Sequence, residues 1–128
     1  MSHIAPVSFK FNTTISAYRI VTLLTGTGNT VKLPANALEL PLGITVDTVL
    51  DTALAGPVAI AGIAKLQFNE TMTCGKLVTA DAGGLGLGIP LVDTTAGVYV
   101  VGMLVGNPVT VTGTVAEVVV NPFFKSIP

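Results

Sequence analysis

Few side chains in this sequence could carry catalysis, and those that could are far apart in the chain. The sequence has one histidine, His3, and one cysteine, Cys74. A cysteine nucleophile needs a base such as histidine beside it, and His3 lies in a segment expected to extend from the domain. Cys74 precedes Gly75, which is typical of an inert thiol in or near a turn. We therefore predict no catalytic residues and a protein that is not an enzyme.

Metal and cofactor sites are not indicated either. The sequence has no His/Cys cluster with zinc spacing. A calcium site would need several aspartates to converge, whereas aspartates in connections are by default solvated turn residues. The candidates in expected connections are Asp47, Asp51, Asp81 and Asp93. The glycine-rich segments 26–28 and 83–88 lack the lysine and following helix of a phosphate-binding loop. We predict no metal and no cofactor, and we interpret these glycines as hairpin turns.

The low charge content indicates that part of the surface is covered by other protein. Charged residues make up 10% of the sequence, against about 25% in an ordinary soluble domain. The chain of 128 residues is long enough for one domain with a single core. Its six basic and seven acidic residues are few for such a surface. We therefore expect a homo-oligomer or a docked subunit.

Nucleic acid and membranes are not expected partners. The six basic residues are scattered and the net charge is −1, so no patch could neutralise several phosphates. Residues 1–10 lack the basic region and apolar run of a signal peptide. Residues 94–116 are uncharged and long enough to cross a bilayer, but threonine, asparagine and proline interrupt them. We interpret this segment as two strands and a turn.

Short β-branched segments separated by glycine, proline and asparagine turns predict an all-β fold. No amphipathic helical stretch of ten or more residues is present. The expected strands are 17–24, 31–33, 42–46, 57–68, 76–81, 97–105 and 109–120. This spacing predicts a small single-domain β-barrel or β-sandwich.

Two of these strands carry further information. In residues 57–68 apolar side chains alternate along the strand. The residues expected on one face are Val58, Ile60, Leu66 and Phe68. In residues 109–120 the valines change parity, which indicates a bulge or a change of sheet near Gly113.

The two ends of the chain hold the candidate interaction residues. We predict that residues 1–16 form an extended N-terminal arm and that residues 17–128 form a β domain. In an extended arm Phe9 and Phe11 share one side, which could reach a sheet edge or a neighbour; the alternative is a first strand of the same domain. Phe123 and Phe124 follow the last expected strand, where they could form a docking tail or close the core.

The order of these segments resembles that of the small capsid decoration proteins, or cement proteins, of tailed bacteriophages. The resemblance covers residues 17–120. It is carried by "LPLGITVDTVLDTALAGPVAIAGIAKLQ" (40–67), "CGKLVTADAGG" (74–84) and "VYVVGMLVGNPVTVTGTVAEVVV" (98–120). The "GGLGLG" segment (83–88) and the scarcity of charge depart from the family pattern.

The resemblance implies a structural protein on the outside of an icosahedral phage head. Such a protein is a small β-barrel or sandwich, often a homotrimer, that clamps neighbouring major capsid proteins and has no catalytic residues. It would be made in the cytoplasm of the host bacterium and located on the outer capsid surface of the virion. The alternative is a host-surface or carbohydrate-binding decoration module, although exposed aromatic residues for such a site are limited to Tyr18 and Tyr99.

Overall fold

The structure, a computed structural model, describes residues 4–26, 28–36, 39–48, 55–88 and 97–126. These residues form nine β-strands: β1 Ile4–Phe11, β2 Ile20–Leu23, β3 Thr30–Lys32, β4 Pro41–Thr45, β5 Ala55–Gln67, β6 Leu77–Ala80, β7 Gly86–Gly88, β8 Gly97–Leu104 and β9 Val115–Ser126. Among them there is no helix that could span a membrane. The prediction of an all-β fold is confirmed.

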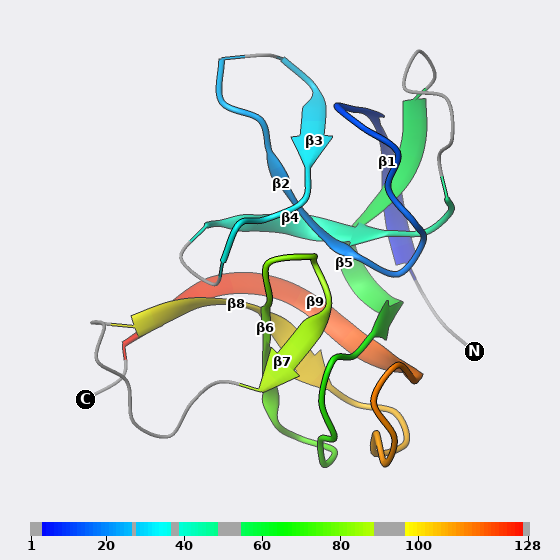
Figure 1. Ribbon diagram of the computed structural model, residues 1–128, viewed down its shortest axis with the longest axis vertical. Helices are drawn as coiled ribbons and strands as arrows, with labels where there is room; N and C mark the ends of the chain where they lie inside the picture. The colour runs from blue at the N-terminus through cyan, green and yellow to red at the C-terminus, as the bar shows by residue number, and fades with distance from the viewer. Residues whose placement is uncertain (1–3, 27, 37–38, 49–54, 89–96, 127–128) are drawn as a thin grey trace.

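Five of the strands close a small barrel. Their order is β1-β3-β2-β4-β5, and β1 also pairs with β5, which completes the ring. The β1–β3 pairing is parallel and the other pairings are antiparallel. Of the two predicted architectures, the barrel is therefore the one that forms. The first segment of the chain takes part as β1, paired with strands of its own domain (Figure 1).

The remaining strands extend the sheet beyond the barrel. Strand β5 continues past the barrel to pair with β9, and the order then runs β9-β8-β6-β7. In Figure 1, β1 to β3 lie in the upper part of the molecule and β6 to β9 in the lower part, with β4 and β5 between them. We call the β5-β9-β8-β6-β7 portion the extension sheet.

A β-bulge in β5 allows one strand to serve both parts. Opposite β1, Ile4 pairs with Gly62 and Pro6 with Ala59, so β5 holds one extra residue between these pairs. Gly62 has a φ of 84°, a left-handed conformation that glycine adopts without strain. The prediction that one face of residues 57–68 is continuous is therefore wrong, because the bulge shifts the parity of every residue that follows.

The shift in parity gives the molecule two hydrophobic cores. The barrel core contains Phe11, Ile15, Val21, Val31 and Val58, with Phe9, Leu33, Leu42 and Ile60 packed against it. The second core lies between the barrel wall and the extension sheet, and its larger members include Ile20, Ile44, Leu66, Phe68, Val78, Val101, Leu104, Val118 and Val120. Strands β2 and β4 are thus buried on both faces, which explains their nearly continuous apolar sequence.

The last part of the chain differs from the sequence prediction in two ways. Strand β9 begins at Val115 rather than 109, after a turn in which Gly113 has a φ of 90°. It also continues through Pro122 to Ser126, so the predicted end at residue 120 is wrong. The β8–β9 register shifts between the Val120 and Phe123 pairs, so Pro122 lies in a bulge. Proline is tolerated there because a bulged residue need not donate a backbone N–H to the neighbouring strand.

Strand β7 was not predicted, because glycine is depleted in strands. Gly86 pairs with Ala80 of β6, and a Cβ atom on it would lie 2.8 Å from side-chain atoms of Leu66 and Phe68. The glycine is therefore required by close packing rather than by a turn.

Gly102 of β8 is similarly constrained. A Cβ atom at this position would lie 1.7 Å from the backbone oxygen of Val119 and 2.8 Å from its carbonyl carbon. We expect Gly102→Ala to lower the free energy of unfolding by about 2 kcal/mol or more, because the backbone of β9 must move. Denaturant unfolding measures this change.

The matched control is Gly28→Ala in the β2–β3 turn, where a Cβ atom would meet nothing within 4 Å. We expect this variant to stay within about 0.5 kcal/mol of the parent. Equal stability of the two variants would contradict the close approach of β8 and β9.

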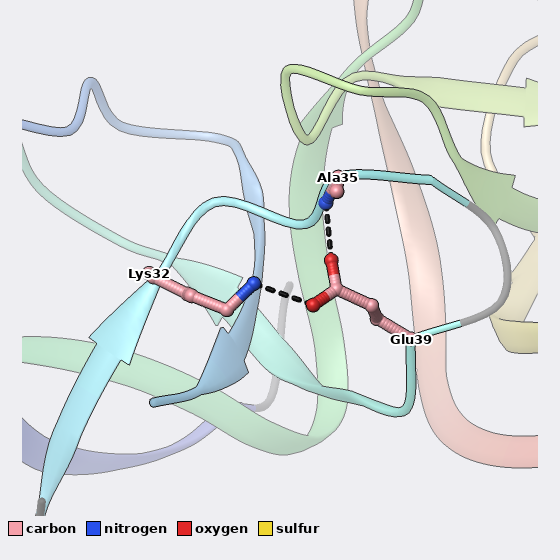
Figure 2. A network of polar contacts seen from close by, with 3 residues as sticks. All are labelled: Lys32, Ala35 and Glu39. Atoms are coloured by element: carbon pink, nitrogen blue, oxygen red, sulfur yellow. Dashed lines mark hydrogen bonds and ion pairs between the residues drawn. The ribbon is translucent and has the colours of Figure 1, made fainter. Parts of the chain in front are cut away.

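An ion pair braces the connection between β3 and β4 (Figure 2). Lys32 Nζ donates a hydrogen bond to Glu39 Oε1 at 2.5 Å, and the backbone N–H of Ala35 donates to Glu39 Oε2. The bond from Lys32, followed by that from Ala35, lowers the pKa of Glu39 below its ordinary value of 4.5. Both side chains are partly exposed, so the pair stabilises the fold only modestly.

We expect Glu39→Gln to lower the free energy of unfolding by up to about 1 kcal/mol at neutral pH. Because the folded-state pKa is lowered, the stabilisation is present above the ordinary pKa and is lost as pH falls through the folded value. Urea unfolding at about pH 7 and about pH 3 should therefore show that the difference in unfolding free energy between the parent and Glu39→Gln shrinks in acid. Asp47→Asn, at an exposed position, is the control; a difference independent of pH would contradict this role of Glu39.

Candidate interaction surfaces

Phe9 and Phe11 face the inside of the barrel. Phe11 is 2% exposed and belongs to the barrel core, while Phe9 is half-buried and packs against that core. Lys10, between them, is exposed. The prediction that the two phenylalanines share one side is confirmed, and that side of β1 packs against the barrel core of its own chain.

Phe123 and Phe124 lie at the far end of β9 and remain accessible. They are 38% and 51% exposed. Phe124 pairs with Tyr99 of β8, and the two rings meet edge to face, with centroids 5.1 Å apart and planes at 68°. This end of the β8–β9 ribbon therefore presents an ordered aromatic surface.

A double-mutant cycle with Tyr99→Leu and Phe124→Leu tests this ring contact. We expect a coupling energy of about 0.5–1.5 kcal/mol in denaturant unfolding, since edge-to-face pairs contribute this much beyond burial. The control cycle combines Tyr99→Leu with Phe123→Leu, because Phe123 pairs with Val100 instead. The same coupling in both cycles would contradict a specific Tyr99–Phe124 contact.

The outer face of the extension sheet carries a row of apolar side chains. Ile63 of β5 pairs with Val119 of β9, Val119 pairs with Met103 of β8, and Met103 pairs with Leu77 of β6. Directly paired residues point to the same face. Their chain neighbours Ala64, Val118, Leu104 and Val78 lie in the second core, so this row points away from it. We call Ile63, Val119, Met103 and Leu77 the outer apolar row.

One residue pair of opposite charge borders this row. Lys65 of β5 pairs with Glu117 of β9, two residues along each strand from Ile63 and Val119 and therefore on the same face. Lys65 is exposed and Glu117 is half-buried. Arg19 on the neighbouring barrel wall donates a hydrogen bond to Gln67 Oε1 at 2.5 Å.

A groove of about 850 Å³ lies at one end of the extension sheet. It is lined by Glu70, Thr71, Met72, Thr73, Gly75, Lys76, Leu77, Gly88, Pro108, Val109 and Thr110. No aromatic residue is among them. Glu70 Oε1 accepts a hydrogen bond from the backbone N–H of Gly88.

The candidate chemical residues do not converge in the described part of the chain. Cys74 is exposed, and its thiol lies 3.6 Å from the Leu104 carbonyl oxygen. Asp81 organises the β6–β7 turn by accepting hydrogen bonds from the N–H groups of Gly83 and Leu85. Within the described ranges no three His, Cys, Asp or Glu residues are grouped as a metal site. His3, Asp51 and Asp93 lie outside the described residues.

The fold defines a small all-β protein in which a closed five-stranded barrel carries an extension sheet. No protein-family model matches the chain, and no curated protein matches it in sequence. Among solved structures, the fold is similar to the N base of head fiber gp8.5 of bacteriophage phi29, with a TM-score of 0.68. The match covers 93% of this chain and 95% of that chain, at 13% sequence identity.

This similarity concerns the fold. At 13% identity, residues of the phage protein cannot be assigned roles in this chain, because one fold hosts many functions. The coverage of both chains nevertheless shows that the barrel and the extension sheet together form one recurring unit.

Proposed function

We propose that this chain is a structural protein of a bacteriophage head. The observation that carries the proposal is the similarity in fold to the base of a phage head fiber over nearly the whole of both chains. The segment resemblance to capsid decoration proteins points to the same class independently. In this proposal the protein is part of the virion and lies on the outer capsid surface after synthesis in the host cytoplasm.

The more specific role we propose is that of a decoration or cement protein. It binds neighbouring major capsid proteins and stabilises their contacts, as a homo-oligomer for which we favour a trimer. The low charge content supports this role, because a surface buried in a static assembly needs few charged side chains. Many copies on one shell would add weak individual contacts through avidity.

Two other classes are less well supported. We propose that the protein has no enzymatic activity; Asp81, for example, serves the β6–β7 turn by accepting hydrogen bonds from the N–H groups of Gly83 and Leu85. A carbohydrate-binding module would use aromatic rings to stack on sugars, and the described residues that line the groove at the end of the extension sheet include none.

The proposal is tested with phage heads that contain or lack the protein. We expect heads without it to rupture at a lower temperature, and added purified protein to co-sediment with them and restore their stability. The expected cause is loss of the contacts that join neighbouring capsid proteins. Heads of equal stability, with no co-sedimentation of the added protein, would refute the cement role.

A further inference from the structure

We infer that the outer face of β5, β9, β8 and β6 is the surface through which copies of this chain contact one another. The inference rests on the homo-oligomer of the proposed function and assigns its interface. That interface is made by the outer apolar row together with Lys65 and Glu117.

The apolar character of this face requires a cover. A sheet that packs one face on a core normally presents polar residues to water on the other. Here four large apolar side chains cross four adjacent strands in direct register, and Met103, near the middle of the row, is 38% exposed. Ile63, Val119 and Leu77 are half-buried, and the second core lies on the opposite face of the sheet.

The charges on this face favour a second copy as the cover. Lys65 and Glu117 lie directly opposite each other on neighbouring strands, so the face carries one cation and one anion beside its apolar row. A copy of the same face, suitably rotated, places Lys65 of one chain against Glu117 of the other while the apolar rows meet. The net charge of −1 gives little repulsion between copies.

The space beside Lys65 also offers room for contact between copies. Two hollows border Lys65. One, of about 280 Å³, is lined in part by Tyr18, Val46 and Ile63. The other, of about 480 Å³, is lined in part by Pro108, Val115 and Glu117. Projecting side chains such as Met103 of a neighbouring copy can occupy hollows of this size.

The first experiment compares the masses of full-length variants in solution by light scattering. We expect an oligomer for the parent protein and a monomer for Met103→Lys, because a charge in the apolar row cannot be buried without a partner. Leu23→Lys is the matched control, since Leu23 is an exposed apolar residue of β2 in the barrel, and it should keep the parental mass. Circular dichroism verifies that each variant is folded. A folded Met103→Lys of parental mass would overturn the inference.

The second experiment mixes two charge variants. Lys65→Glu and Glu117→Lys each place like charges across the interface, so each alone should have a reduced mass. An equal mixture should regain mass, because the acidic face of one variant meets the basic face of the other. Mixing cannot repair the like charges within a chain, so recovery reports contact between chains, and its absence would overturn the inference.

Co-sedimentation with undecorated heads separates this inference from the proposed function. If Met103→Lys keeps the parental mass but no longer binds heads, the face contacts the capsid; the inference is then refuted and the cement role stands. If the parent protein assembles through this face but heads without it are equally stable, the interface stands and the cement role is refuted.

Discussion

Strand β5 is the element on which both halves of this structure depend, since it is the one strand shared by the closed barrel and the extension sheet. Its first half pairs with β1 and β4, and its second half pairs with β9. A regular strand would keep the same side chains on one face throughout. The extra residue before Gly62 changes this, so Val58 enters the barrel core and Leu66 enters the second core.

The two cores explain much of the unusual composition. A barrel wall normally presents polar side chains on its outer side, but β2 and β4 are covered on that side by the extension sheet. Ile20 therefore belongs to the second core and its neighbour Val21 to the barrel core. The outer apolar row accounts for a further part of the apolar content. Internal packing thus explains part of the low charge, and the proposed contact between copies explains the rest.

The functional proposals fit a static assembly. The fold is similar to that of the N base of a phage head fiber, and the described residues offer two surfaces for contacts. The aromatic pair of Tyr99 and Phe124 and the outer apolar row both lie on the extension sheet. The barrel supports this sheet from its core side and leaves the other face for contacts.

The sequence by itself determined the all-β class, most of the strands and the break at Gly113, because these depend on local propensity and on glycine and proline chemistry. It also placed Phe9 and Phe11 on one side of their segment. It could not reveal the bulge in β5, because the alternation of residue types along the strand is regular. The bulge arises only because β5 pairs with barrel strands in its first half and with β9 in its second half. Strand β7 and the passage of β9 through Pro122 were hidden for a similar reason: local propensity disfavours both, and neighbouring strands impose them. The outer apolar row could not be predicted from the sequence either, because its four residues come from four separate strands and only the pairing of these strands brings them side by side.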